Sequence, residues 1–187
     1  YGVDRQTVLA VWGMESNFGK RRGEIPVISA LATLAYEGRR GRFFEQQLTS
    51  ALKILQNGDV APENMKGSWA GAMGHTQFIP TSYEAYAADF RGDGRRDIWS
   101  DDPTDGLAST AKYLSNFGWR RGQPWGVEVV LPSGFNYGLA GGAKKSAAEW
   151  QALGVRAATG GQIRDFGAAE ILVPEGAQGV AFMTFKN

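Results

Sequence analysis

The chain has 187 residues, of which 43% are hydrophobic and 21% are charged, as is typical of one compact domain or of one domain with a small one appended. The 20 lysines and arginines nearly balance 19 acidic residues, so no general attraction for nucleic acid is expected. The absence of cysteine excludes disulfides, thiolate metal sites and cysteine nucleophiles, and a single histidine, His75, excludes metal sites built on several histidines. No apolar run approaches the roughly 20 residues of a membrane span.

The first two thirds of the chain show helical patterns. The first helix is expected to begin after Asp4, a suitable N-cap, and to continue through Phe18 to a stop at Gly19, with Glu15 in its last turn. Further helical patterns, separated by glycine or proline, cover residues 28–36, 43–56, 82–89 and 105–117.

The character of the sequence changes after Trp125. Strand patterns cover 127–131, 169–173 and 179–185, and a short helix is expected from Ser146, where Ser146 and Glu149 form a capping-box pattern. The glycine-rich residues 138–143 favour a flexible loop. The predicted fold class is α+β and mainly helical, with a helical domain over 1–125 and a small β-rich subdomain over 126–187.

Glu15 lies in the block Trp12-Gly-Met-Glu-Ser-Asn-Phe-Gly19. Helical spacing places Val11 and Trp12 behind it and Phe18 ahead, which predicts an apolar setting. Such a setting favours the protonated carboxyl group that a general acid needs. An isolated glutamate at a helix end is more often an ordinary solvated residue. A catalytic role for Glu15 therefore needs support from a second sequence block.

The second block is Lys66-Gly-Ser-Trp-Ala-Gly-Ala-Met-Gly-His-Thr-Gln-Phe-Ile-Pro-Thr-Ser-Tyr83. Its closely spaced glycines, together with Ser68, Gln77 and several aromatic residues, predict a loop that offers hydrogen bonds beside apolar surfaces. A tight structural turn explains the same residues equally well.

Several ordered blocks together resemble the membrane-bound lytic murein transglycosylase B family. They are the Glu15 block, Ala30-Leu-Ala-Thr-Leu34, Gly67-Ser-Trp-Ala-Gly-Ala-Met-Gly74 with Gln77-Phe78, Asp89-Phe-Arg-Gly-Asp-Gly94, Ala111-Lys-Tyr-Leu114 and Gly118-Trp119. The resemblance implies a lysozyme-like helical core around a glycan groove, joined to a small β-rich subdomain.

The resemblance also implies an activity. The family cleaves the bond between N-acetylmuramic acid and N-acetylglucosamine in peptidoglycan strands without adding water, and it leaves a 1,6-anhydromuramoyl end. Glu15 would act first as the acid and then as the base, with no cofactor required, while the 2-acetamido group of the substrate supports the anomeric carbon.

The same matching implies substrate-binding positions at Ser68, Met73, Gln77 and Tyr113. Ser68 and Gln77 would bind sugar substituents through hydrogen bonds, and Tyr113 would lie near the acetamido group. Taken one by one, Met73 is more typical of a core residue and Tyr113 of packing between helices.

Arg39 and Arg40 match an arginine pair in the family. A guanidinium group there would bind the carboxylate or peptide that muramic acid carries. Solvated arginines in a basic turn are the alternative.

Residues 89–100 resemble a calcium loop, which some family members use. Asp89 and Asp93 fit the first and fifth positions, but Arg91 stands at the third and Ser100 at the twelfth, where a glutamate is wanted. Asp105 is a later carboxylate. An arginine pointing into the loop would itself neutralise the aspartates, so a metal-free, salt-bridged turn is favoured over calcium binding at Asp89 and Asp93.

Two other functions remain open at this stage. A hydrolytic, lysozyme-like muramidase needs a second carboxylate, for which Asp93, Asp97 and Glu84 are available. A non-catalytic peptidoglycan-binding module would use the same aromatic residues and glycines.

The resemblance further implies a monomer in the periplasm of a Gram-negative bacterium, attached to a membrane only if a lipid anchor precedes Tyr1. It also implies that the family sequence continues beyond Asn187 into a segment that completes the groove.

Overall fold

The computed structural model describes residues 1–187, which form two compact units, Tyr1–Arg121 and Gly122–Asn187. The division lies before the boundary expected between residues 125 and 126. Trp125 already belongs to the second unit, because its carbonyl accepts the Phe185 N–H at 2.8 Å and its ring packs on Phe182 at 5.4 Å. No helix combines the length and apolar character that a membrane span needs.

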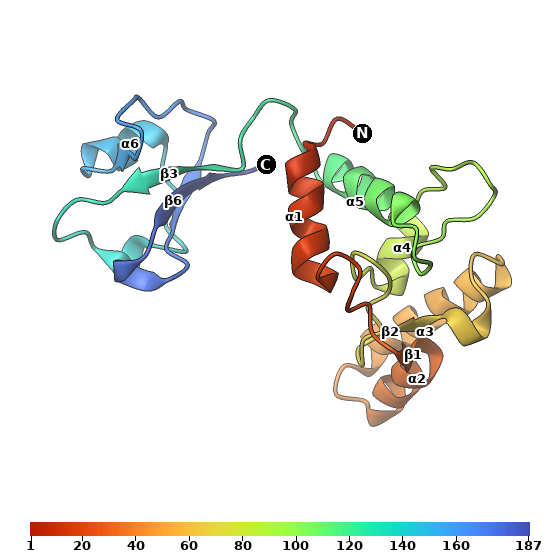
Figure 1. Ribbon diagram of the computed structural model, residues 1–187. Coiled ribbons are helices and arrows are strands. Elements are labelled where there is room, and N and C mark those ends of the chain that lie inside the picture. Colours follow the sequence, from red (N-terminus) through yellow and green to blue (C-terminus); the bar gives the residue numbers. More distant parts are fainter. The chain divides into compact units, whose positions relative to one another are not determined.

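The first unit is mainly helical (Figure 1). Its elements, in chain order, are α1 (Arg5–Ser16), β1 (Ile25–Pro26), α2 (Val27–Glu37), α3 (Gly41–Gln56), a 3-10 turn (Pro62–Asn64), β2 (Lys66–Gly67), α4 (Pro80–Tyr86) and α5 (Thr104–Asn116). The helices predicted over 28–36, 43–56 and 105–117 are thus confirmed to within two residues at each end.

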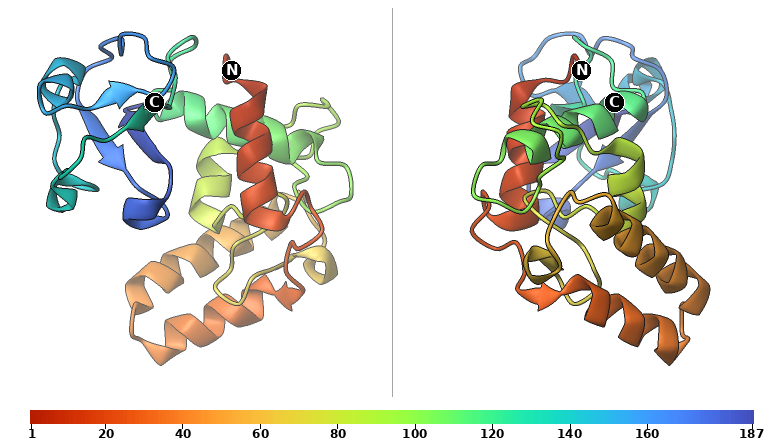
Figure 2. Two further views of the ribbon diagram at one scale, coloured as in Figure 1. Left: turned by 60° about the vertical axis from the view of Figure 1, so that its left-hand side comes forward. Right: turned by 90° about the vertical axis from the view of Figure 1, so that its right-hand side faces the viewer.

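The core of this unit forms where α2 and α3 lie side by side, as both views of Figure 2 show. Val27 and Leu31 are one helical turn apart and fully buried, and the buried face of α3 follows the same period through Phe44, Ala51 and Ile54. Burying this apolar area is the main stabilising contribution to the unit.

Two helix ends differ from the prediction. The first helix ends at Ser16 and not at Phe18, because Asn17 and Phe18 adopt left-handed conformations with φ of 50° and 56°. The fourth ends at Tyr86 and not at residue 89. There the chain becomes extended at Ala87, and the Ala88 N–H donates to Ser109 Oγ at 2.9 Å.

The glycine-rich block is a tightly folded loop beside the β1–β2 pair, in which Ile25 pairs with Gly67. Met73 bridges to both Gly67 and Phe78. A Cβ atom on Gly67 would lie 2.2 Å from the Ala72 carbonyl oxygen, so no larger residue fits there. The block is thus a loop, as predicted, and its backbone segments approach one another closely.

The second unit is a four-stranded antiparallel sheet with strand order β4-β3-β6-β5. The strands are β3 (Gly126–Val130), β4 (Arg156–Ala157), β5 (Ala169–Leu172) and β6 (Ala181–Phe185). Every second residue of β6 is buried, as expected for a strand with one face on a core.

The helix α6 (Ala147–Ala152) packs the fully buried Trp150 into this core and forms the predicted capping box between Ser146 and Glu149.

The prediction of a flexible loop over 138–143 is wrong. A 3-10 turn covers Tyr137–Leu139, and the Gly141 N–H donates to the Ile171 carbonyl at 2.9 Å, so this segment is tied to the sheet.

Candidate active site

Glu15 lies in the last turn of α1, as predicted. Its side chain is exposed and makes no hydrogen bond or ion pair. Phe18 folds back over Gly13, and its ring packs edge-on against Trp12 at 5.5 Å between centroids. The predicted apolar enclosure of Glu15 is therefore wrong for this chain by itself, because these rings pack on one another and leave the carboxylate in solvent.

His75 lies under this turn and is only 2% exposed. Its Nδ1 accepts the indole N–H of Trp12 at 3.1 Å, and its backbone carbonyl accepts the Ser16 hydroxyl at 2.6 Å. Burial lowers the pKa of the imidazole below its usual range. In the sequence, His75 served only to exclude metal sites built on several histidines. Its place inside the glycine-rich block was nevertheless a signal of a structural or functional role.

Gln77 has a left-handed backbone with φ of 52° and a half-buried side chain. Its amide nitrogen donates to the carbonyl oxygens of Arg22 at 3.1 Å and Gly74 at 2.9 Å. Both amide hydrogens are thus used inside the fold, and the side-chain oxygen is the atom left to accept a hydrogen bond from a ligand.

Ser68 organises the start of the same loop. Its Oγ accepts the N–H groups of Ala70 and Ala72 at 3.3 and 3.1 Å, and its own hydroxyl hydrogen has no acceptor. A hydrogen bond from Ser68 to a bound sugar is compatible with this arrangement, because the donor is free.

Met73 and Tyr113 lie deeper than the predicted role as substrate contacts suggested. Met73 is 0% exposed and belongs to the core, so its side chain presents no surface to a ligand, as the alternative interpretation held. Tyr113 is half-buried on α5, where its ring packs against Phe78, Tyr86 and Phe117 at centroid distances of 5.8, 5.1 and 4.6 Å.

Arg39 and Arg40 are exposed between α2 and α3. The Arg40 guanidinium lies 4.3 Å from the centre of the Phe43 ring, and the Arg39 N–H donates to Glu37 Oε2 at 3.2 Å. Neither guanidinium group has a carboxylate partner within the chain, so both charges are available to an anion.

The structure joins the two sequence blocks through direct hydrogen bonds. Ser16, next to Glu15, contacts the backbone of His75, and Gln77 contacts the carbonyl of Arg22 in the segment that leaves α1. Tyr113 reaches the same loop through Phe78. Arg39 and Arg40 lie apart from these contacts, between helices α2 and α3.

Two aspartates of the loop that follows α4, Asp89 and Asp93, come together with Asp105 in the first turn of α5, since carboxylate oxygens of the three lie within 4.8 Å of one another. Arg91 reaches into this cluster, 3.2 Å from Asp93, 3.9 Å from Asp105 and 3.1 Å from Asp102. The Asp89 carboxylate already accepts three backbone N–H groups, from residues 92–94, and these bonds lower its pKa. Arg91 offsets part of the charge of the cluster, and backbone N–H groups already occupy the Asp89 carboxylate, so these residues are a poor fit for calcium.

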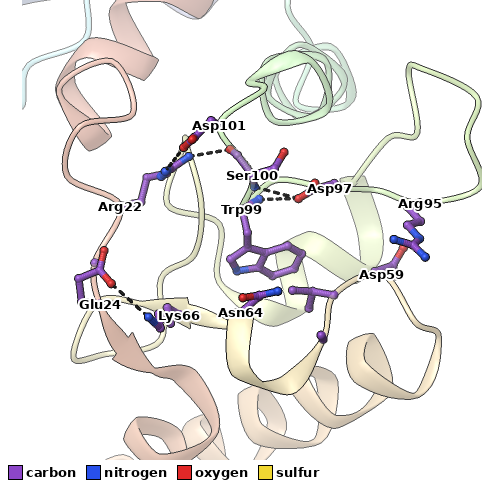
Figure 3. A pocket seen from close by; sticks show the side chains of 13 residues that line it. Arg22, Glu24, Asp59, Asn64, Lys66, Arg95, Asp97, Trp99, Ser100 and Asp101 are labelled. Atoms are coloured by element: carbon purple, nitrogen blue, oxygen red, sulfur yellow. Dashed lines mark hydrogen bonds and ion pairs between the residues drawn. The ribbon is translucent and has the colours of Figure 1, made fainter.

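A cavity of about 530 Å³ opens elsewhere in the first unit (Figure 3). Ion pairs flank it, Arg22 with Asp101 at 2.6 Å and Lys66 with Glu24 at 3.4 Å, and Trp99 forms part of its wall. Neither Glu15 nor any predicted substrate-binding residue lines this cavity, whereas Asp97, a candidate second carboxylate of the hydrolytic alternative, does. It shares only Arg22 and Ser100 with the contacts around His75.

The model of the transglycosylase SLT domain matches residues 1–187. The chain belongs to this family. The resemblance seen in the sequence blocks is thereby confirmed.

Individual relatives support the assignment. The chain is 38% identical over 141 residues to the membrane-bound lytic murein transglycosylase B of Escherichia coli strain K12, and the matched region covers 72% of this chain and 38% of that protein. A crystal structure of SltB3 from Pseudomonas aeruginosa in complex with NAG-NAM-pentapeptide is 55% identical, with a TM-score of 0.88 over 97% of this chain and 50% of that one.

The Escherichia coli lytic transglycosylase Slt35 in complex with calcium is more distant, at 31% identity and a TM-score of 0.85 over 98% of this chain and 58% of that one. These structures confirm the predicted lysozyme-like α+β fold. The chain spans only about two fifths to three fifths of the length of these relatives.

Proposed function

We propose that the chain is the catalytic part of a lytic transglycosylase that cleaves the bond between N-acetylmuramic acid and N-acetylglucosamine in peptidoglycan and leaves a 1,6-anhydromuramoyl end. The observation that carries the proposal is an unpaired, exposed Glu15 at the end of α1 in a chain that matches the family over its full length. A complex of SltB3 with NAG-anhNAM-pentapeptide, 54% identical to this chain, contains the kind of anhydro end that this reaction makes.

Glu15 acts twice in this mechanism. It first donates its proton to the oxygen that leaves the anomeric carbon, while the 2-acetamido group of the muramic acid supports the developing positive charge. The resulting carboxylate then removes the proton of the C6 hydroxyl, whose oxygen forms the new bond to the anomeric carbon. The proton returns to Glu15 and no water is consumed. Attack within one sugar is favoured by its large effective molarity over a reaction with solvent.

The exposed position of Glu15 requires that the substrate complete its surroundings. A bound glycan strand covers the carboxylate and removes water from it, which favours the protonated acid that the first step needs. Peptidoglycan is therefore both the reactant and a part of the site.

Substrate binding is assigned to the residues that have free polar atoms. Ser68 would donate its hydroxyl hydrogen to a sugar substituent, and Gln77 would accept a hydrogen bond through its side-chain oxygen. Arg39 and Arg40 would bind the carboxylate or peptide of muramic acid. Tyr113 would contribute the exposed part of its ring, whereas Met73 supports the loop from the core.

The hydrolytic alternative is weaker because it needs a free second carboxylate. Glu84 lies 3.6 Å from Lys53, and Asp93 and Asp97 lie 3.2 and 4.0 Å from Arg91. Each of these acids is paired with a cation in its own part of the fold. This arrangement favours the single-glutamate mechanism.

No cofactor is assigned to the reaction. Arg91 takes the place of a cation in the aspartate loop, so calcium is not needed to hold it. Because the substrate surrounds the cell, the protein would act in the cell envelope, in the periplasm of a Gram-negative bacterium, as a monomer on glycan strands and without nucleic acid partners.

Digestion of purified peptidoglycan followed by mass spectrometry of the fragments tests the proposal. Fragments that end in anhydromuramic acid, one water lighter than reducing ends, are expected. Reducing muramic acid ends would establish the hydrolase instead. Binding of glycan without any cleavage across the pH range would establish the non-catalytic module.

A further inference from the structure

The tautomer of His75 follows from its partners. An indole N–H can only donate and a backbone carbonyl can only accept. Nδ1 lies 3.1 Å from Trp12 Nε1, so it carries no proton, and Nε2 lies 2.8 Å from the Ser100 carbonyl oxygen, so it carries one. The ring is thus neutral, with its hydrogen on Nε2. Burial is the main cause of the lowered pKa of the ring, and the Arg22 guanidinium 3.2 Å from Nε2 lowers this pKa further. The hydrogen bond to Ser100 and the charges of Asp97 and Asp101 raise the pKa, but the net shift is downward.

His75 holds α1 at two points that flank Glu15. Its ring binds Trp12, three residues before the glutamate, and its backbone carbonyl binds Ser16, one residue after it. Positions four apart lie on the same face of a helix, so these two contacts fix the rotation and the height of the turn between them. On the other side, the backbone N–H of His75 donates to the Ile98 carbonyl at 3.2 Å.

Two glycines, Gly19 and Gly106, leave the space that His75 occupies. A Cβ atom on Gly19 would lie 2.6 Å from Nδ1, and one on Gly106 would lie 3.2 Å from the His75 Cβ. The chain after Glu15 also passes through two left-handed residues, Asn17 and Phe18, a conformation that such residues keep only where their neighbours enforce it. His75 contacts the residues on either side of this pair, since Ser16 precedes it and Gly19 follows it.

We infer that His75 is a positioning residue for Glu15, which holds the last turn of α1 through Trp12 and Ser16 and anchors it to the segment around Ser100. The inference rests on the proposed catalytic role of Glu15. A carboxylate that must serve one oxygen as an acid and another as a base tolerates little displacement, and a shift of about 1 Å costs on the order of a hundredfold in rate.

Two substitutions separate the two sides of the ring. His75→Asn places an amide oxygen near the position of Nδ1 and keeps an acceptor for Trp12, whereas His75→Gln keeps a donor toward Ser100 and loses that acceptor. Trp12→Phe removes the indole N–H but retains an aromatic ring beside Phe18. Trp125→Phe, in the second unit, is the matched control.

The kinetics of peptidoglycan cleavage should show a loss of about tenfold or more in kcat, with KM within about twofold, for His75→Gln and Trp12→Phe. His75→Asn should retain more activity than His75→Gln, and Trp125→Phe should match the unmutated protein. Rates are measured per folded molecule. Folded His75→Gln and Trp12→Phe variants with unchanged kcat would overturn the inference, as would a loss that appears only in KM.

Nuclear magnetic resonance of the unmutated protein supplies a readout that does not depend on activity or on the folding of any variant. The His75 ring should show the Nε2-protonated tautomer at neutral pH, and the Trp12 indole hydrogen should exchange slowly with solvent. The opposite tautomer, or a freely exchanging Trp12 hydrogen, would overturn the inference. Failure of the proposed function is distinguishable whatever the state of His75, because then either Glu15→Gln would still cleave glycan or the unmutated protein would not cleave it at all.

Discussion

Ser16 ties the turn that carries Glu15 to the backbone of His75, with 2.6 Å between its Oγ and the His75 carbonyl oxygen. The same Oγ accepts the Gly19 N–H at 2.9 Å, and Ser16 is 1% exposed. Ser16→Ala leaves both groups without this partner and should lower the free energy of unfolding by about 1–3 kcal/mol in denaturant titrations. Ser29→Ala, at an exposed position of α2, is the control, and an equal loss in both variants would contradict the assigned role of Ser16.

Glu15→Gln should lower glycan cleavage by at least about a hundredfold while glycan binding is kept, because the amide preserves the shape of the side chain but has no proton to transfer. Cleavage rates and a pull-down with insoluble peptidoglycan measure the two effects. Glu45→Gln, an exposed substitution on α3, should behave as the unmutated protein. Substantial cleavage by Glu15→Gln would direct attention to Asp93 and Glu84 instead.

Gln77→Ala should reduce both stability and turnover. The fold loses the two hydrogen bonds that join this loop to Arg22 and Gly74, which lowers the free energy of unfolding by about 1–3 kcal/mol. Ser68→Ala removes an acceptor within its own loop and should cost less stability. Turnover per folded molecule decides the binding role, and if it is unchanged in either variant, that residue is only structural.

Calorimetry should find no calcium affinity in the micromolar range for the unmutated protein. Arg91→Ala leaves the carboxylates of the loop uncompensated, so this variant should be less stable in a chelator and should gain both calcium binding and stabilisation by calcium. Arg95→Ala, in the same loop but without an ion pair, should change neither property. Tight calcium binding by the unmutated protein would refute the assignment of Arg91 as the cation of the loop.

The stability of the first unit should depend on pH through His75. Because folding lowers the pKa of this imidazole, the unfolded chain binds the proton more readily than the native one. The stabilisation is therefore fully present above the unfolded value of about 6.5 and is lost as the pH falls below it. Denaturation midpoints should drop more steeply between about pH 7.5 and 5.5 in the unmutated protein than in His75→Gln. Parallel curves would show that the ring titrates alike in both states.

Local patterns in the sequence determined the elements and the place of the key residue. The periods of apolar residues predicted α2, α3 and α5 within two residues, and the serine and glutamate of α6 predicted its capping box. The block around Glu15 placed it in a last helical turn and, with the glycine-rich block, indicated the family. Such features depend on neighbours within about one helical turn, which a sequence displays directly.

Only the tertiary structure decided which polar groups meet. The contact between Trp12 and His75 spans 63 positions of the chain, and that between Gln77 and Arg22 spans 55. The left-handed residues that end α1 early, the burial of Met73 and the exposure of Glu15 likewise depend on what packs against each segment. Periodicity shows which face of an element is apolar, but the partner of a buried polar atom is determined by the distances and angles between elements once the core has formed.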